Sequence, residues 1–319
     1  MAVYKTANAI GEREDLSNVI SRIDPAETPL ISNAPKKTVK GVFTEWQVQT
    51  LASAVDTNYV NEGADYSYVN PTATSRLGNY CMISVQAGSV SGTLDVVEKA
   101  GRQRESAYVR ILKGLEQRRD MDKYLFKNQA RSGSDPRKAG ALPSWITNAD
   151  FSTAGTTSAV ATGDGSDGAT MSGNNRALSL ALIDNANLLA YNDGGSPDML
   201  VVSPANKVAF SDLSSGSAVT NQLHMTAGKP QDAVIIGSVS LYLTDFGTLN
   251  VVIDRQAPNT EAYLLDSDHY AIGHLAGRFF KTVDVAPTGD ATNFAIVSEW
   301  TLIVDAPKAH GAVYDLSTT

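Results

Sequence analysis

The chain of 319 residues is 42% hydrophobic and 19% charged, which is typical of a folded globular protein and excludes wholesale disorder. A net charge of −8 argues against tight, sequence-independent binding of nucleic acid, because such binding needs a basic face. The single cysteine, Cys81, allows neither an intramolecular disulfide nor a zinc site built on several thiolates. No run of eighteen apolar residues occurs, so we expect no membrane span.

The N-terminal region predicts helices that are too short to be stable alone. Apolar residues three and four apart over residues 11–22 indicate one amphipathic helix. Asp24, Pro25 and Glu27 then form a start that resembles a capping box, and Pro29 is expected to end this second helix after one turn. Pieces this short need a surface to lie on, which indicates an N-terminal arm.

Two runs with a period of two indicate β-strands on either side of a long polar segment. The residues that share one face are Val42, Thr44, Trp46 and Val48 in the first run and Cys81, Ile83, Val85 and Ala87 in the second. Residues 51–79 between them have little apolar periodicity. We expect either a disordered insertion or a long two-stranded flap that a partner stabilises, because isolated hairpins are marginal in water.

The strongest helical segment runs over residues 94–128 without a proline, and at 1.5 Å per residue it would span roughly 50 Å. Its apolar stripe consists of Leu94, Val97, Tyr108, Ile111, Leu112, Leu115 and Leu125. Glu98 and Arg102 add a favourable i,i+4 pair.

Residues 98–138 are basic, with twelve Lys or Arg against six Asp or Glu, a net of +6 that leaves −14 for the rest of the chain. We interpret this basic segment either as a solvated helix face or as a helix that pairs with acidic neighbours, in the same chain or in another subunit.

The second half of the chain alternates helices and strands, which makes the class mixed α+β. Residues 152–175 predict a flexible loop, because eighteen of the twenty-four are Gly, Ser, Thr or Ala. Helices are predicted over residues 176–192, ending at a Gly-Gly stop, and from Ser203-Pro204 to about Leu213. The predicted strands are 199–202, 234–236, 239–244, 249–253, 262–265 and a long last strand with Phe294, Ile296, Trp300, Leu302 and Val304 on one face.

No motif for catalysis, cofactor binding or metal binding stands out, so we name no such residue and expect no cofactor. The four histidines are His224, His269, His274 and His310, and the spacing of five between His269 and His274 suits neither one helix face nor one strand face. Residues 163–168 resemble a calcium loop but lack its alternating ligands and terminal Glu, so a flexible turn is favoured. Cys81 is favoured as a small buried hydrophobe over a nucleophile. These features favour an assembly protein over an enzyme.

A series of local motifs occurs in a characteristic order: Gly11–Ser17 (GEREDLS), Ile23–Pro29 (IDPAETP), Ala139-Gly140 with Trp145-Ile146, Tyr242–Gly247, Tyr263–Asp266, Thr288–Asp290 and Glu299–Leu302. With these motifs the chain resembles, over essentially its whole length, the major capsid proteins of tailed bacteriophages with the Hong Kong 97-type fold. The resemblance implies a division into an N-terminal arm (1–41), an extended loop (42–92), a peripheral domain with a spine helix and flexible loop (93–175), an axial domain (about 176–255) and a return to the peripheral domain with the long C-terminal strand (256–319).

The resemblance also implies a function. The chain would self-assemble, as pentamers and hexamers, into the icosahedral head that encloses the double-stranded DNA of a tailed phage. It would be part of the virion and assemble in the host cytoplasm, with scaffold, portal and decoration proteins as candidate partners, without sequence-specific DNA binding and without a membrane. The acidic balance suits a container whose lining does not grip phosphates.

Two other classes remain open: another phage structural protein of the tail or a decoration protein, and a soluble enzyme with an unrecognised carboxylate site. The long spine-type helix speaks against the first of these. If the capsid interpretation holds, we expect the flap and the arm to be buried mostly by other subunits, because they lack an apolar stripe broad enough to pack on their own chain.

Overall fold

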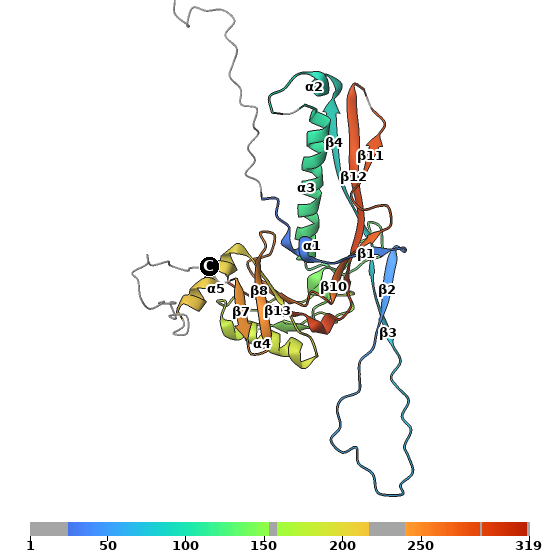
Figure 1. The fold of residues 1–319 in the computed structure, drawn as a ribbon, viewed down its shortest axis with the longest axis vertical. Coiled ribbons are helices and arrows are strands. Elements are labelled where there is room, and N and C mark those ends of the chain that lie inside the picture. Colours follow the sequence, from blue (N-terminus) through green and yellow to red (C-terminus); the bar gives the residue numbers. More distant parts are fainter. Residues whose placement is uncertain (1–24, 102, 153–157, 217–239, 288, 318–319) are drawn as a thin grey trace, which may run out of the picture.

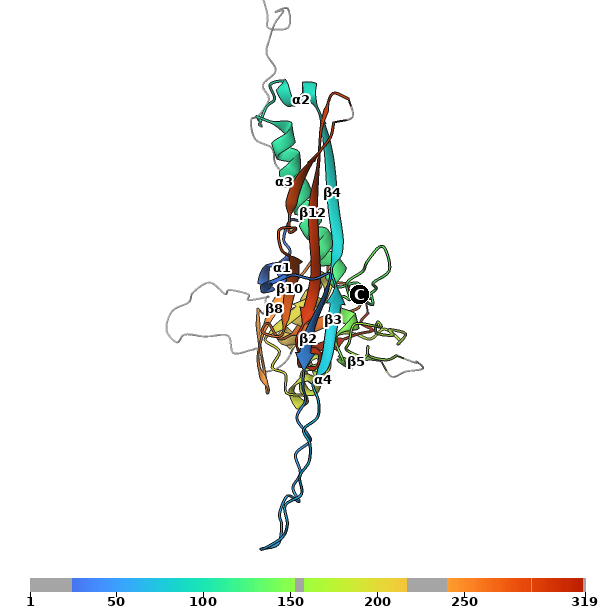
Figure 2. The same cartoon turned by 90° about the vertical axis from the view of Figure 1, so that its right-hand side faces the viewer.

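The computed structural model describes residues 25–101, 103–152, 158–216, 240–287 and 289–317. Figure 1 shows a narrow stem of one long helix and several strands above a rounder body, with residues 49–74 extending as a long loop in the opposite direction. The view in Figure 2 shows the stem edge-on, with the helix on one side of the strands. The architecture is mixed α+β, in agreement with the predicted class.

The stem is built on a five-stranded sheet with the order β1-β10-β12-β11, in which β4 also pairs with β12. Its strands are β1 (Lys36–Val39), β4 (Met82–Ser91), β10 (Tyr270–Leu275), β11 (Lys281–Val285) and β12 (Ala291–Val304). The last of these is the predicted long strand, and its predicted apolar face is confirmed, since every member is at most 5% exposed. The sequence did not predict β1, β10 and β11.

The body contains a six-stranded sheet with the order β5-β13-β9-β6-β8-β7. Its strands are β5 (Asn148–Asp150), β6 (Met199–Val202), β7 (Leu241–Thr244), β8 (Gly247–Ile253), β9 (Ala262–Leu265) and β13 (Gly311–Val313). The predicted bounds of β6 and β9 are confirmed, and every residue of both strands is buried. Both faces of these two strands are therefore covered, which explains why they are continuous apolar runs without alternation.

Two helices cover one face of the body sheet. Leu200 and Val202 of β6 share a hydrophobic cluster with Ile183 of α4 (Leu180–Asn192) and Phe210 of α5 (Pro204–Gly216), while the alternate residues of β6 enter a second cluster around Trp145.

Both helices were predicted, although their bounds differ. The start of α4 falls four residues later than predicted, because the backbone at Arg176 bridges to Leu316 instead. Its predicted stop is confirmed, as Gly194 follows with φ +92°. Two short 3-10 turns are η2 (Leu142–Ser144) and η3 (Pro307–Ala309).

The single helix predicted over residues 94–128 is wrong, because this region forms two helices. These are α2 (Gly92–Val96) and α3 (Glu105–Leu125). Val97 is extended, with φ −63° and ψ 132°, and Gly101 has φ +80°, a left-handed conformation that favours glycine and is incompatible with a continuing helix.

The start of α3 is set by a side chain from α2. Asp95 accepts hydrogen bonds from the backbone N–H of Ser106 at 2.9 Å and from its hydroxyl at 3.0 Å, which satisfies one of the free donors at the helix N-terminus. The predicted Glu98–Arg102 pair therefore does not lie within a helix, and Arg102 itself lies outside the described residues.

The polar face of β4 packs against α3, so the apolar face predicted for this strand points outward. Gln117 of α3 donates a hydrogen bond to the Ser84 backbone carbonyl at 2.8 Å, and Gln86 donates to Asp120 Oδ2 at 2.6 Å. Ile83 and Val85, on the other face, are 50% and 51% exposed. Hydrogen bonds to α3 thus decide which face of β4 is covered within the chain.

Pro29 begins a helix rather than ending one. In α1 (Pro29–Asn33) the proline occupies the first turn, where a missing N–H leaves no bond unmade. Leu30 and Ile31 are 1% and 2% exposed within the chain's own core, so the expectation that other subunits bury the arm is wrong for this part of it. The helix predicted over residues 11–22 lies outside the described residues, as does the strand predicted at 234–236.

The flap is two-stranded only at its base. β2 (Phe43–Val48) pairs antiparallel with β3 (Ser75–Tyr80), a strand that the sequence did not predict, whereas the predicted second strand, β4, pairs with β12 in the stem sheet. Thr44, Trp46 and Val48 form the less exposed face, as predicted, but Val42, expected on the same face, is 42% exposed. Residues 49–74 between them form no strand and are all exposed.

The flexible loop predicted over residues 152–175 is wrong for the described part, 158–175. Ala161 is only 1% exposed, and Ala159 pairs with Thr170 in a bridge. A Cβ added at Gly165 would lie 2.6 Å from the Trp145 ring. The small residues here therefore allow close packing against an aromatic ring rather than flexibility.

Candidate assembly surface

The described histidines do not converge on a metal site. His269 Nε2 lies 3.9 Å from Asp266 Oδ2, whereas His274 Nε2 lies 3.2 Å from a threonine hydroxyl, so each has its own partner. His310 is buried, and its Nδ1 accepts a hydrogen bond from the Asp266 backbone N–H. Burial lowers the pKa of His310 to about 4, which keeps its ring neutral at physiological pH. His224 lies outside the described residues.

The acidic turn at residues 163–168 uses its carboxylates internally. Asp164 Oδ1 accepts hydrogen bonds from the Ser166 backbone N–H at 2.8 Å and from the Thr162 hydroxyl at 2.9 Å. Asp167 Oδ1 accepts from the Thr162 backbone N–H and shares the single hydroxyl proton of Thr162 with Asp164. The turn therefore satisfies its own oxygens. Over the ranges that the structure describes, no three His, Cys, Asp or Glu side chains are grouped to hold a metal ion.

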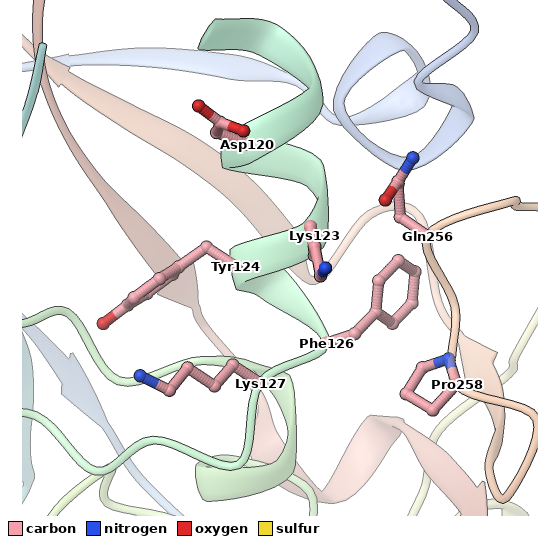
Figure 3. Close-up of a pocket in the computed structure, with 7 residues that line it drawn as sticks. All are labelled: Asp120, Lys123, Tyr124, Phe126, Lys127, Gln256 and Pro258. Carbon is pink, nitrogen blue, oxygen red and sulfur yellow. The ribbon is translucent and has the colours of Figure 1, made fainter. Parts of the chain in front are cut away.

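A pocket of about 390 Å³ lies beside the C-terminal end of α3 (Figure 3). The lining residues are Asp120, Lys123, Tyr124, Phe126, Lys127, Gln256 and Pro258. Two ammonium groups and one carboxylate surround an aromatic and proline floor, with no histidine, cysteine or serine that could act as a nucleophile or imidazole base.

Among the described residues, the stem sheet has an exposed apolar face. Directly paired residues share one face of a sheet, and the register sets Val85 beside Val297 and Ala295 beside both Ala87 and Val283. We call this the outer sheet face. Its members are Ile83, Val85, Ala87, Val283, Val285, Ala295 and Val297. Four of them are 41–51% exposed, although the water-facing side of a sheet is normally polar.

The edge of the stem sheet is also open. β4 pairs with β12 over ten residues, and among the described residues no strand pairs with the other edge of β4. A long unpaired edge beside an apolar face is a template for association with another chain. The stem thus presents both a contact face and a free edge.

The long loop adds a second exposed apolar region. Residues 49–74 carry several large side chains without cover from the chain itself: Leu51, Val55, Tyr59, Val60, Tyr66, Tyr68 and Val69, each at least 66% exposed. An isolated chain gains nothing from placing these side chains in water. The loop is therefore suited to lying on another surface.

Part of the basic segment pairs with acidic residues of its own chain. Three arginines reach carboxylates from other elements: Arg110 with Asp284 at 2.6 Å, Arg131 with Asp164 at 3.8 Å, and Arg137 with Glu299 at 2.9 Å. Arg118 instead donates to the Ser32 hydroxyl at 2.7 Å. Of the two interpretations, pairing with acidic neighbours therefore holds for these three arginines, within one chain.

Solved structures share this architecture. The chain resembles the capsid asymmetric unit of cyanophage A-1(L), with a TM-score of 0.67, 14% identity and 98% of each chain covered. It also resembles the encapsulin complex from Synechococcus elongatus, with a TM-score of 0.59, 10% identity and coverage of 100% of this chain and 98% of the other. A structure of phage G major capsid and decoration proteins gives a TM-score of 0.56, 11% identity and 99% and 100% coverage. At these identities the likeness establishes the Hong Kong 97-like fold alone.

Sequence comparison distinguishes among proteins of this fold. The chain is 32% identical over 124 residues to the major capsid protein of Escherichia phage Phieco32, a match that spans 38% of this chain and 35% of the relative. A model of the SU10 major capsid protein family matches residues 3–317, nearly the whole chain. Within the described ranges, no helix has both the length and the apolar character needed to cross a bilayer. The chain therefore belongs to the SU10 major capsid protein family, as a structural component of the phage head shell rather than an enzyme.

Proposed function

We propose that many copies of this chain, arranged as pentamers and hexamers, form the icosahedral head that encloses the double-stranded DNA of a tailed phage. The observation that carries this proposal is the outer sheet face with the free edge of β4. An isolated chain leaves this apolar surface in water, whereas neighbouring copies in a closed shell would cover it. Fully burying an exposed aliphatic side chain contributes about 1.5–3 kcal/mol. The exposed members of this face are already about half buried, so each would gain roughly half of this, and a shell repeats the contact in every copy.

Within that shell, the chain is divided into the same parts that the family resemblance implies. Residues 1–41 are the arm, and 42–92 the extended loop, whose exposed residues 49–74 lie over a neighbouring copy. Residues 93–175 form the peripheral domain, with α3 as its spine, and about 176–255 the axial domain near the capsomer centre. Residues 256–319 return to the peripheral domain through β12. The sheets cross these boundaries, because β4 of the extended-loop range pairs with β12, and β6, β7 and β8 of the axial range share a sheet with β5, β9 and β13. The support for these bounds is therefore the family resemblance rather than separate sheets.

The enclosed DNA is held without sequence-specific contacts. The chain carries −8 overall, and three arginines of its basic segment are already paired with carboxylates. A net negative chain binds phosphates weakly, so the genome can slide during entry and exit. Scaffold, portal and decoration proteins are the further partners, and assembly takes place in the host cytoplasm.

Electron micrographs of the purified full-length protein test the shell. We expect closed particles of uniform size, and nuclease-protected DNA inside particles taken from infected cells. Tubes or fibres would indicate a tail component, and small monodisperse particles would indicate a soluble protein that does not form a shell.

Substitution on the outer sheet face tests the surface that carries the proposal. Ile83→Ser with Val85→Ser should lower the yield of sedimenting shells while circular dichroism of the dissociated chain stays unchanged, because both side chains are half exposed in the isolated chain. The matched control is Val208→Ser in α5, which removes a side chain that is 63% exposed on the body. Equal shell yield from the double variant and the control would contradict this role of the face.

A further inference from the structure

Two buried carboxyl groups meet where the arm, α3 and the body join. Asp122 lies near the end of α3, and Asp254 directly follows β8; both are 0% exposed. Asp122 Oδ1 accepts a hydrogen bond from the Ile31 backbone N–H of α1 at 3.1 Å. Asp254 Oδ1 accepts one from the Gln256 backbone N–H at 2.8 Å. Each aspartate thus uses one oxygen to hold a backbone segment.

The remaining oxygens of the two aspartates have no donor. Among the described residues, neither Asp122 Oδ2 nor Asp254 Oδ2 has a hydrogen-bond partner other than the opposite carboxyl, and the two side chains are in hydrogen-bond contact. Two ionised carboxylates can only accept, so they cannot bond to each other, and two like charges in one buried site strongly disfavour double ionisation. A single proton would satisfy both oxygens at once.

We propose that Asp122 and Asp254 share one proton between their Oδ2 atoms. This proton latches α1 and α3 to the connection between β8 and β9, and its loss at alkaline pH loosens the junction. The step is a simple acid dissociation: the proton leaves to solvent, and the pair changes from one negative charge to two. The inference concerns a single chain, so it holds whether or not the chain forms a shell.

The groups around the pair support retention of this proton. Arg118, one turn earlier on α3, is the cation that acts on Asp122, but its guanidinium also donates to Ser32 of α1. Tyr270 of β10 faces Asp122 electrostatically with a buried, neutral hydroxyl. Within the described structure α1 carries no ionisable side chain, and Arg255, next to Asp254, is exposed. One cation partly engaged elsewhere therefore faces two carboxyl groups.

The direction of the pH effect follows from this environment. Burial, followed by the hydrogen bond and charge of Asp254, raises the pKa of Asp122 to about 8, against the opposing effects of the Ile31 N–H and Arg118. The pKa of an unfolded aspartate is about 3.9. The latched state therefore binds one more proton than the open state between about pH 4 and pH 8. The stabilisation that the proton gives to the latched state is complete below about pH 4 and declines as pH rises to about 8, by up to tenfold in the equilibrium constant between latched and open states per pH unit. The proton itself leaves the latched state only near pH 8.

Infrared spectroscopy detects the proton directly. At pH 7 the carbonyl band of a protonated carboxylic acid should be present in the full-length protein and diminished in both Asp122→Asn and Asp254→Asn. The difference between parent and variant cancels the contribution of other protonated carboxyls such as Glu261. Asp120→Asn, an exposed residue on the same helix, is the control and should leave the band unchanged. An unchanged band in both Asn variants would overturn the proposal, because both aspartates would then be ionised at pH 7.

Hydrogen exchange detects the latch. The Ile31 amide, which donates to Asp122, should exchange up to tenfold faster per pH unit between about pH 4 and pH 8, after correction for its intrinsic rate, and then level off. Asp122→Asn should flatten this dependence, because its amide oxygen still accepts from Ile31 and its NH₂ replaces the shared proton. If that variant does not fold, Asp254→Asn provides the same arrangement with the roles exchanged. A corrected parent rate that does not change with pH overturns the proposal without any variant.

Discussion

The body sheet and the stem sheet differ in how far their apolar residues are buried. In the body, β6 and β9 are buried on both faces by elements of the same chain. In the stem, the inner face of β12 is buried while the outer sheet face stays open. One chain is thus enough to bury the apolar strands β6 and β9 of the body. In the stem, by contrast, the outer sheet face is apolar but is not covered by its own chain. Apolar content alone therefore does not reveal which strands are interior in a single chain.

The largest effect that separates the two regions should come from a body residue. Leu264, at 0% exposure in β9, packs in the cluster with α4 and α5. Leu264→Ala should lower the free energy of unfolding by about 2–5 kcal/mol, through lost burial and the cavity left behind. Urea denaturation of the dissociated chain measures this. Val85→Ala in the stem, which is half exposed, is the matched control and should change stability by less than about 0.5 kcal/mol. Similar losses in the free energy of unfolding from both variants would contradict the difference in burial between the two sheets.

The stability of the body should also depend on pH, through one buried carboxyl group. Glu261, just before β9, accepts a hydrogen bond from the Tyr263 hydroxyl, and burial raises its pKa to about 7. Because the pKa is raised on folding, its contribution to stability is present below about pH 4.5 and is lost as pH rises to about 7, by about 3 kcal/mol. Glu261→Gln keeps the acceptor for Tyr263 and removes the ionisation, so it should unfold at higher urea than the parent at pH 8. Equal midpoints of the two proteins at pH 8 would refute this.

A smaller loss in the free energy of unfolding is expected when a buried ion pair of the stem is broken. Glu299 of β12 is 5% exposed and contacts two cations, Arg137 at 2.9 Å and Arg278 at 2.8 Å. Arg137→Gln should lower the free energy of unfolding by about 1.5–3 kcal/mol, because the buried carboxylate loses a charged hydrogen bond. Arg278→Gln should cost less, since the Arg278 side chain is 49% exposed, against 24% for Arg137. The reverse order in urea denaturation would argue against burial as the cause.

Cleavage in the long loop should have the smallest effect on the fold. Residues 49–74 are all exposed, whereas the small residues of 158–175 pack against Trp145. Limited proteolysis of the dissociated chain should therefore cut first within 49–74 and leave the circular dichroism of the nicked chain unchanged. A first cut in 158–175 or in α3, identified by mass spectrometry, would contradict the packing described for those regions.

Sequence patterns predicted the elements whose environment is uniform. The runs 199–202 and 262–265 have no polar residue, and the alternating face of β12 is buried throughout, so local pattern and tertiary position agree. The helix over 94–128 was overextended, because the apolar spacing continues through a glycine that is left-handed in the fold.

Which face of β4 is covered could not be predicted from the sequence, for a different reason. Its covered side is chosen by Gln117 and Asp120 of α3, and its apolar side faces away from its own chain. The pairing of Asp122 with Asp254 was likewise hidden, since the two residues are far apart in sequence and join only through the fold. No residue was predicted as a site. The alternation of Ile83, Val85 and Ala87 did mark part of the outer sheet face as apolar, but the pattern does not say that this face is left open by the chain.

The position of Cys81 gives the chain a built-in reporter of opening. Its thiol is 0% exposed, in a small cluster with Val39 of β1, Ala271 and Ile303, and it donates to the Gly41 carbonyl at 3.6 Å. Burial raises the pKa of this thiol, which further slows its reaction with alkylating reagents. Because the chain has no other cysteine, the labelling rate of intact protein reports on this one site, which opens when β1 and the segment at Gly41 separate from the stem sheet or when that sheet unfolds. If the labelling rate is followed from the free chain to the finished particle, it shows when during assembly the region around Cys81 stops opening. No foreign probe has to be introduced.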